Sequence, residues 1–442
     1  MSDRIKSYRA IWKLSWPIIL ANLTIPLITA TDTAVMGHQA EPKFIAGIAL
    51  GGIFFNFLYT GFNFLRMGTT GLVAQSFGAK DNLEVKSIIM TSLIIAGCLG
   101  LLIIIACFPL INIIQAVLSA SKESKDLMRQ YILVRIFDAP ATLMNMVFLG
   151  IFFGMGAPKS AMSQLILISV FNVTLSIVFV FSFNWGIQGV AFASVIAQWF
   201  GMFLSFYLLI KIMGFSSSTL KIVYFSKTLI NKFRLSIFFK ISKDLLIRTF
   251  CLVSAELILI NEASKFGDEY LAATQIYIVI LGFIAYGLDG FAHAAETIVG
   301  QAIGKRDVKT IKPFIVKIFI IAVLSSIVFS LLLLIFNKYI FYTLTQINEV
   351  LMICNSLIPF LIVLPLFGVW PYILDGIFIG ATETRSMRNS SIIAVLVLFL
   401  LIKLNYNLEY GLSYVWGSFL TYLVLRAVYL ALQIKKIFKR KI

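Results

Sequence analysis

Long apolar stretches, separated by short polar segments, follow one another along the whole chain. A membrane-spanning helix needs about 20 mostly apolar residues, because the hydrocarbon core of a bilayer is about 30 Å thick. Twelve stretches of this kind can be placed, at 12–36, 45–73, 87–117, 127–154, 161–183, 187–212, 243–263, 270–299, 313–336, 350–380, 390–404 and 410–434. The pattern predicts an all-α polytopic membrane protein with twelve transmembrane helices.

The composition supports the same class. Of the 442 residues, 60% are hydrophobic and 13% are charged, whereas about a quarter of the residues of a soluble domain are charged. A soluble enzyme, a disordered chain and a nucleic-acid-binding module are thereby excluded. The four cysteines all lie within apolar runs, and their spacing indicates neither a disulfide framework nor a metal site.

The net charge of +17 predicts the orientation. One side of the twelve spans receives 26 of the 37 Lys and Arg residues, and the other side receives seven. Since cytoplasmic loops are enriched in Lys and Arg, both termini are expected in the cytosol. The basic start runs into the first span without a cleavage site, which favours a bacterial inner membrane. The expected partners are the lipid bilayer and small organic molecules, with no nucleic acid, and a monomer is expected.

An internal repeat divides the chain. The stretch from Val73 to Asp81 (VAQSFGAKD) returns at 299–307 (VGQAIGKRD), and Gly150 to Gly154 (GIFFG) returns at 376–380 (GIFIG). Both pairs show the same offset in the numbering, 226. Six spans in each half make a parallel repeat, and solute sites in such transporters lie near the bilayer midplane. We predict an N-lobe (1–213), a cytosolic linker (214–242) and a C-lobe (243–442).

Ionisable side chains within spans are costly and mark candidate functional groups. Glu256 and Asp375 lie mid-span. Asp289, His293 and Glu296 recur at i, i+4 and i+7 and therefore share one helix face. Such carboxylates can carry a proton or hold Na⁺ or a cationic solute. The alternative is a static polar network that fixes helix packing.

The remaining charged groups have simpler interpretations. Arg135 and Asp138, three residues apart, are expected to form an ion pair. Arg66, Arg248 and Arg426 lie near the cytosolic side, where long side chains reach towards water. An intramembrane metal enzyme is a further alternative, since one His and two acids share a helix, but a metal site draws ligands from several elements. No resident metal or cofactor is expected.

Four motifs carry a resemblance to a known family: 64–78 (FLRMGTTGLVAQSFG), 286–296 (YGLDGFAHAAE), 374–382 (LDGIFIGAT), and Asp32-Thr33 with Gly37-His38. The chain resembles the DinF-like branch of the MATE (multidrug and toxic compound extrusion) transporters over essentially its whole length. The resemblance implies twelve helices in two six-helix lobes around a cavity that opens to either side alternately. It also implies export of amphipathic, mostly cationic compounds in exchange for H⁺ or Na⁺.

The resemblance also implies roles for individual residues. Asp32 matches the family's acid in span one, but the acid expected four residues after Asn172 is replaced by Ser176. Glu256 and Asp375 match acids that plant and bacterial members use. We therefore expect the coupling site in the C-lobe, at Glu256 and Asp375 with Asp289, His293 and Glu296, and with Asp32 as a further candidate.

The identity of the coupling ion and the nature of the substrate both stay open. H⁺ and Na⁺ both suit the carboxylates as coupling ion. Asn172, Arg66 and Arg135 are the candidates for the substrate cavity. A lipid-linked saccharide flippase of the same superfamily is the alternative transporter, and it would favour a cationic cavity, for which only Arg66 and Arg135 are available in the N-lobe.

Overall fold

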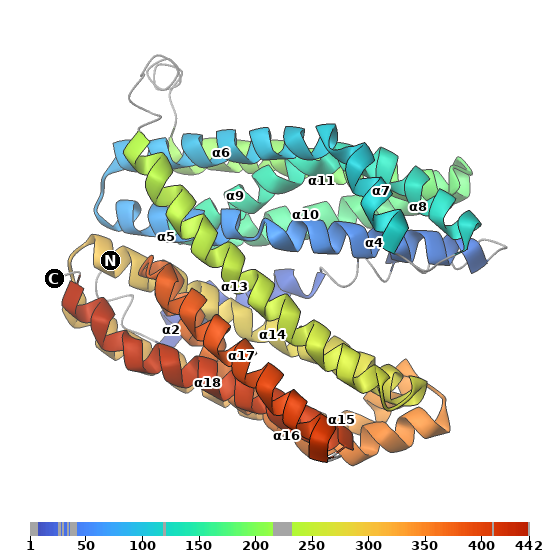
Figure 1. Cartoon of the computed structure of the whole chain (residues 1–442). Helices are drawn as coiled ribbons and strands as arrows, with labels where there is room; N and C mark the ends of the chain where they lie inside the picture. Colours follow the sequence, from blue (N-terminus) through green and yellow to red (C-terminus); the bar gives the residue numbers. More distant parts are fainter. Residues whose placement is uncertain are drawn as a thin grey trace. The chain divides into compact units, whose positions relative to one another are not determined.

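The computed structural model describes residues 8–24, 28, 31–32, 35, 42–117, 121–214, 232–408 and 411–440. Within these residues every regular element is a helix (Figure 1). Ten segments of the described chain are long and apolar enough to cross a membrane. The predicted all-α membrane fold is confirmed.

The ten segments coincide with ten of the predicted spans. They are Ala46–Gly78, Asn82–Ile105, Lys122–Met155, Pro158–Ser182, Gly186–Met213, Asp268–Gly304, Ile311–Leu344, Asn348–Gly380, Thr384–Leu404 and Gly411–Lys435. Of the two other predicted spans, 12–36 lies partly outside the described residues. The span 243–263 lies within a single helix, α13 (Lys232–Ser264), whose apolar run is interrupted by Arg248, Glu256 and Glu262.

The chain divides into two compact units. The N-terminal unit comprises Leu20–Phe77 and Asp81–Phe239. Its helices are α4 (Pro42–Gly61), α5 (Phe64–Gly78), α6 (Asn82–Ile105), α7 (Cys107–Val117), α8 (Lys122–Arg135), η1 (Ile136–Asp138), α9 (Ala139–Met155), α10 (Pro158–Ile177), η2 (Val178–Ser182) and α11 (Gly186–Met213). Within it α10 packs on α11, α6 on α9, and α4 on α8.

The C-terminal unit comprises Lys240–Ile442 with Gly78–Lys80 and the described part of residues 1–19. Its helices are α2 (Tyr8–Asn22), most of α13, α14 (Asp268–Gly304), α15 (Val308–Leu344), α16 (Asn348–Gly380), α17 (Thr384–Leu408) and α18 (Gly411–Arg440). The helix α16 is central, because α14, α15 and α18 all pack against it (Figure 1).

In the N-terminal half, three predicted spans consist of two α-helical segments, and a fourth, 161–183, ends in the π-helix η2. The span 45–73 is built from α4 and α5, 87–117 from α6 and α7, and 127–154 from α8 and α9 with the 3₁₀ turn η1 between them. Pro140 stands in the first turn of α9, where its missing N–H is tolerated and its fixed φ favours a helix start. Short 3₁₀ segments within a helix often mark functional hinges.

The internal repeat is also visible in the packing. A methyl group on Gly150 would lie 2.5 Å from the carbonyl oxygen of Arg66, and one on Gly376 would lie 2.3 Å from that of Ala292. Gly376 and Ala292 are the counterparts of Gly150 and Arg66, because each lies 226 residues further along the chain. Gly154 against Thr70 and Gly380 against Glu296 repeat the relation at 2.9 and 2.5 Å. Each half therefore contains the same close helix crossing, which only a residue without a side chain allows.

The turns that follow these crossings also correspond. Gly156 has φ +73° and Thr382 has φ +54°, and the two positions are again displaced by the offset. In each half the next residue donates its backbone N–H to a carbonyl five residues earlier, from Ala157 to Phe152 at 2.8 Å and from Glu383 to Phe378 at 3.0 Å. The repeat therefore extends from the sequence to the backbone hydrogen bonds.

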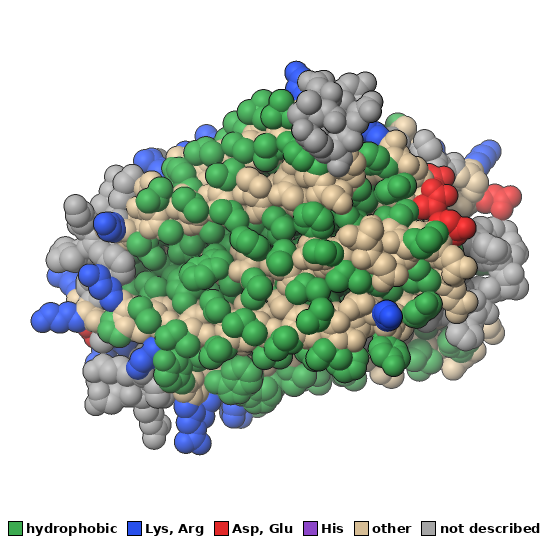
Figure 2. Space-filling model, turned by 90° about the horizontal axis from the view of Figure 1, so that it is seen from below, with side chains coloured by type: hydrophobic (Ala, Val, Ile, Leu, Met, Phe, Trp, Pro, Cys, Tyr) green, Lys and Arg blue, Asp and Glu red, His purple; other side chains and the backbone are tan. Residues whose placement is uncertain are grey.

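Hydrophobic side chains are widely exposed on the helices. Figure 2 shows a face covered by them, with Lys and Arg gathered towards one end and Asp and Glu towards the other. Ile335 and Leu432 are 65% and 71% exposed. Large exposed apolar patches of this kind mark an interaction or membrane surface, as expected for helices that contact lipid.

Candidate functional site

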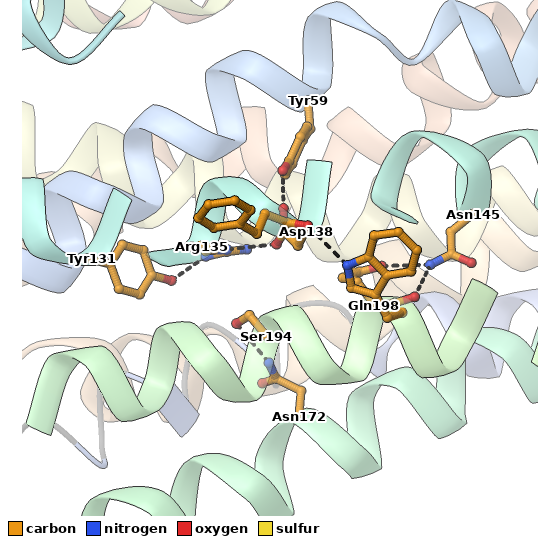
Figure 3. A network of polar contacts seen from close by, with 10 residues as sticks. Tyr59, Tyr131, Arg135, Asp138, Asn145, Asn172, Ser194 and Gln198 are labelled. Carbon is orange, nitrogen blue, oxygen red and sulfur yellow. Dashed lines mark hydrogen bonds and ion pairs between the residues drawn. The ribbon is translucent and has the colours of Figure 1, made fainter. Parts of the chain in front are cut away.

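A buried cluster in the N-terminal unit joins an arginine, an aspartate and two tyrosines (Figure 3). Arg135 at the end of α8 pairs with Asp138, Nε to Oδ2, at 3.4 Å. Tyr59 on α4 donates its hydroxyl to Asp138, and Arg135 donates to the hydroxyl of Tyr131. The guanidinium also lies over the ring of Phe55, 4.7 Å from its centroid. The predicted ion pair is confirmed, and it is the centre of a larger cluster.

The cluster stabilises the break between α8 and α9 in the fourth predicted span, 127–154. Asp138 ends the 3₁₀ turn η1, and the indole of Trp199 on α11 donates to the carbonyl of Phe137 in the same turn at 3.0 Å. On the other side, Gly100 of α6 lies so close that a methyl group there would be 2.4 Å from Cα of Pro140. Groups from three helices, α4, α8 and α11, thus stabilise the irregular backbone, and α6 packs directly against it.

Asp32 lies in the same unit and is buried, with 6% of its surface exposed. The hydroxyl of Ser176 on α10 donates to its Oδ1 at 3.2 Å, and Arg135 lies within electrostatic range. Ser176 is the position at which the resemblance leads one to expect a second acid. The structure brings this position and Asp32 together, with a hydroxyl in place of the carboxylate.

Asn172 lies one turn before Ser176 on α10. Its amide nitrogen donates to the hydroxyl of Ser194 on α11 at 2.9 Å (Figure 3). Its side-chain oxygen is buried and has no hydrogen-bond partner among the described residues. Ser169, Asn172 and Ser176 form a polar stripe on α10, since residues three and four apart share a helix face. The stripe contacts Thr24, Ser194 and Asp32.

In the C-terminal unit Asp375 on α16 is held by two arginines. Arg248 on α13 and Arg426 on α18 both direct Nη2 at its Oδ2, the latter at 2.7 Å. All three side chains are buried, at 5%, 7% and 6% exposure. The expectation that Arg248 and Arg426 reach towards the cytosolic water is wrong. Their counter-ion comes from another helix, which the local sequence does not reveal.

The other C-terminal candidates do not join this ion cluster as a set. His293 Nδ1 and Glu296 Oε1 lie 3.1 Å apart on α14, and both are buried. Asp289, one turn earlier, is partly exposed and acts electrostatically on Tyr372. Glu256 on α13 is exposed. Among the described residues no three His, Cys, Asp or Glu side chains converge in a manner that could hold a metal ion.

Arg66, an N-lobe candidate for the substrate cavity, lies on α5. Its guanidinium carbon is 5.9 Å from the centroid of the Phe153 ring. Its backbone carbonyl is the group against which Gly150 packs. The position of Arg66 is therefore fixed by the helix crossing.

Sequence reasoning missed several of these groups. Asp244 is 3% exposed, pairs with Arg388 at 2.7 Å and accepts a hydrogen bond from Thr384 at 3.0 Å. The sequence did not indicate that it is buried, because it lies at the end of a predicted span. Glu262, near the end of the predicted span 243–263, is also buried, and it pairs with Lys265 at 2.6 Å. No signal in the sequence separates Tyr59 and Tyr131 from the other tyrosines.

Comparisons with known proteins identify the family. The model of the family MatE matches residues 17–178 and 245–404. DNA damage-inducible protein F of Escherichia coli is 30% identical over 397 residues, which cover 89% of this chain and 85% of that protein. The chain belongs to the MatE family. MATE proteins are transporters, so the chain is a membrane transporter and not an enzyme.

Other relatives agree with this assignment. Protein DETOXIFICATION 42 of Arabidopsis thaliana is 26% identical over 352 residues, covering 76% of this transporter and 64% of its own length. Among solved structures, a variant of the Vibrio cholerae MATE transporter VcmN matches with a TM-score of 0.89 at 16% identity, covering 99% and 98% of the two chains. A MOP superfamily transporter from Pyrococcus furiosus gives 0.83 at 20%, covering 99% and 97%. The fold is thus the MATE fold of twelve helices in two lobes.

Proposed function

We propose that the transporter exports amphipathic, mostly cationic organic compounds in exchange for protons that enter the cell. The two lobes, 1–213 and 243–442, would alternate access around the linker 214–242, in a monomer with both termini in the cytosol of a bacterium. Support comes from the relatives, which include a probable multidrug resistance protein, NorM, from Listeria monocytogenes, 26% identical over 202 residues, and from the orientation that the Lys and Arg distribution predicts.

Asp32 is the carboxylate best suited to proton coupling, and its environment is the observation that carries the proposal. It is buried, it accepts one hydrogen bond from a neutral hydroxyl at 3.2 Å, and the nearby Arg135 is already paired with Asp138. A buried carboxylate with an uncharged partner can gain or lose a proton without breaking a direct ion pair. The proposed coupling site therefore moves from the C-lobe, where the sequence led us to expect it, to the N-terminal unit.

Asp375 is less suited to this role. Two guanidinium groups already bind one of its oxygens, so an entering proton or cation has to displace them. Breaking such a buried pair is unfavourable, because it leaves uncompensated charge at bilayer depth. We therefore assign Asp375 to the ion cluster and not to the proton pathway.

Glu256 is the C-terminal acid best placed to meet a cationic substrate. It lies in the middle of the predicted span 243–263, and its side chain is exposed. A charged side chain at that depth faces a water-filled cavity in preference to lipid, because exposure to hydrocarbon is costly. Glu256 is accordingly proposed to bind the positive charge of the substrate in the cavity, while Asp32 carries the proton.

The coupling ion can be tested in vesicles that contain the purified protein. The probe is a cationic rhodamine methyl ester, supplied with a proton gradient alone and then with a sodium gradient alone. Dye transport is expected with the proton gradient and is expected to be lost in Asp32→Asn. Glu262→Gln removes a buried acid outside the site and serves as the matched control. Transport driven by sodium alone, or full activity of Asp32→Asn, would overturn the proposal.

Ser176 provides a second test of the same site. Ser176→Asp places a second carboxylate within about 3 Å of Asp32, and two close carboxylates readily share one cation or proton. This variant is expected to make transport respond to sodium, whereas Ser176→Ala is expected to stay proton-driven. If Ser176→Asp leaves the ion dependence unchanged, the Asp32–Ser176 pair is not the coupling site.

A further inference from the structure

A groove runs between α16 and α18 in the C-terminal unit, where the two helices pack against each other. Its volume is about 270 Å³, and it is lined by Phe367, Trp370 and Leu374 of α16 and by four residues of α18 between 424 and 431, all of them apolar. Along α18 the groove covers two helical turns, about 10 Å. It lies within two of the membrane-crossing segments, Asn348–Gly380 and Gly411–Lys435.

The shape of the groove follows from its two walls. On α18, Ala427 and Ala431 stand one turn apart and leave the space that longer side chains would fill. On α16, Trp370 forms the opposite wall, and it stacks on Phe319 of α15 with the ring centroids 5.2 Å apart. The Trp370 side chain is nevertheless 46% exposed. The groove is therefore an open depression whose aromatic wall is fixed by packing.

The groove ends at a strongly basic segment. Ala427, Ala431 and Lys435 follow one another at intervals of four residues and so share one face of α18. Lys435 is exposed and is the last residue of the membrane-crossing segment, about 6 Å beyond Ala431 along the helix. Residues 435–441 (KKIFKRK) include five Lys or Arg, and no Asp or Glu follows Glu409. An apolar groove at membrane depth thus leads to a concentration of positive charge at the membrane edge.

The two features together match one kind of molecule. The groove offers no hydrogen-bond partner from its lining side chains, so it does not suit water, whereas a hydrocarbon chain gains dispersion contacts with its walls. Clusters of Lys and Arg directly beyond a transmembrane helix attract anionic lipid headgroups. An anionic phospholipid carries a hydrocarbon chain and a net negative headgroup in the order in which the groove and the basic segment follow each other.

We propose that the groove between α16 and α18 binds an anionic phospholipid, with an acyl chain along Trp370, Ala427 and Ala431 and the headgroup at Lys435. The ammonium group of Lys435 has three N–H donors for the phosphate oxygens. The bound lipid joins the same two helices that the ion pair of Asp375 and Arg426 joins on other faces. It therefore stabilises their packing. This inference goes beyond the proposed export function and does not depend on the coupling ion.

Quenching of tryptophan fluorescence by brominated lipids tests the site in the full-length protein. The protein is placed in phosphatidylcholine vesicles in which a small fraction of the lipid is brominated phosphatidylglycerol or, in parallel, brominated phosphatidylcholine. The difference between the parent protein and Trp370→Phe gives the signal of Trp370. At equal mole fraction, brominated phosphatidylglycerol is expected to quench this signal severalfold more efficiently than brominated phosphatidylcholine.

Further variants distinguish a lipid in the groove from a diffuse attraction of anionic lipid. Ala431→Phe fills the groove with a ring and is expected to abolish the preference at Trp370. Lys435→Gln is expected to lower the preference about fivefold, as for loss of one basic residue at the membrane surface. Leu432→Phe adds the same ring at a position that is 71% exposed and outside the groove. Lys211→Gln removes an exposed lysine from the last turn of α11. Both controls are expected to keep the preference.

Several outcomes would overturn the inference. They are equal quenching of Trp370 by the two brominated lipids, a preference that Ala431→Phe retains, and a loss in Lys211→Gln as large as that in Lys435→Gln. Relief of the quenching by the cationic rhodamine ester would show that the groove takes a substrate, and the lipid assignment would fail. The quenching assay uses no ion gradient, so failure of the proposed export function leaves the lipid site standing.

Discussion

The N-terminal and C-terminal halves share a helix crossing but bury different charges beside it. Gly150 and Gly154 in one half correspond to Gly376 and Gly380 in the other, with the same backbone oxygens opposite them. By contrast, the positions that correspond to Asp32, Arg135 and Asp138 are occupied by Ile258, Leu361 and Leu364. The backbone architecture is thus duplicated, while the buried charges are specific to each half.

This difference suggests that the buried acids of the two halves have different roles. In the N-terminal unit one acid, Asp32, has the Ser176 hydroxyl as its hydrogen-bond partner among the described residues, and the nearby Arg135 is paired with Asp138. In the C-terminal unit the buried acid Asp375 is bound by two arginines. A buried carboxylate beside a hydroxyl suits proton exchange, whereas a carboxylate bound by two arginines suits a static ion cluster. Proton coupling is therefore expected in the N-terminal half, at Asp32.

The largest expected effect concerns this difference. Asp32→Asn is expected to reduce proton-driven dye export to the level of empty vesicles, because the carboxylate can no longer release a proton. Asp375→Asn is expected to keep transport of the cationic rhodamine ester responsive to the proton gradient. Initial rates of ester transport by the two variants measure this. Loss of all gradient response in Asp375→Asn would place coupling in the C-terminal half and refute the comparison.

The next effect concerns the stability of the N-terminal cluster. Asp138→Ala removes the counter-ion of Arg135 and the acceptor of Tyr59, and breaking one member of a buried ion pair costs about 3–5 kcal/mol of unfolding free energy. Thermal unfolding in detergent is expected to report this loss. Asp126→Ala, an exposed aspartate on α8, is the control, with a change of about 0.5 kcal/mol or less. Equal melting temperatures of the two variants would show that the cluster is not structurally important.

The shared crossing predicts matched effects in the two halves. In Gly150→Ala and Gly376→Ala the added methyl group overlaps a backbone oxygen, and overpacking of this kind costs about 1–3 kcal/mol. Both variants are expected to lose similar amounts of stability in the same unfolding assay. Gly52→Ala has nothing within 4 Å of the new methyl group, and it is expected to gain about 0.5–1 kcal/mol from helix propensity. Clearly unequal losses at Gly150 and Gly376 would show that the two crossings are not equivalent.

The sequence predicted local features better than distant ones. Apolar length located the spans, and the spacing of three residues was sufficient for the Arg135–Asp138 pair, because an i, i+3 pair is fixed by helix geometry. The constant offset of the repeat was enough to align Gly150 with Gly376. The partners of Asp375, however, are 127 and 51 residues away along the chain. Helix packing alone decides that contact, so Arg248 and Arg426 were assigned to the water interface.

The smallest effect concerns a turn in which one repeat has glycine and the other has threonine at a left-handed position. Thr382 has φ +54° where the other half has Gly156 with φ +73°. A left-handed conformation costs a residue with a side chain roughly 1–2 kcal/mol, and threonine is β-branched, which makes that region less favourable still. Thr382→Gly is therefore expected to raise the unfolding free energy by about 1 kcal/mol, and Gly156→Thr to lower it by a similar amount. If Thr382→Gly is instead destabilising, the side-chain contacts of Thr382 outweigh the backbone strain, and the two turns are equivalent in shape but not in energy.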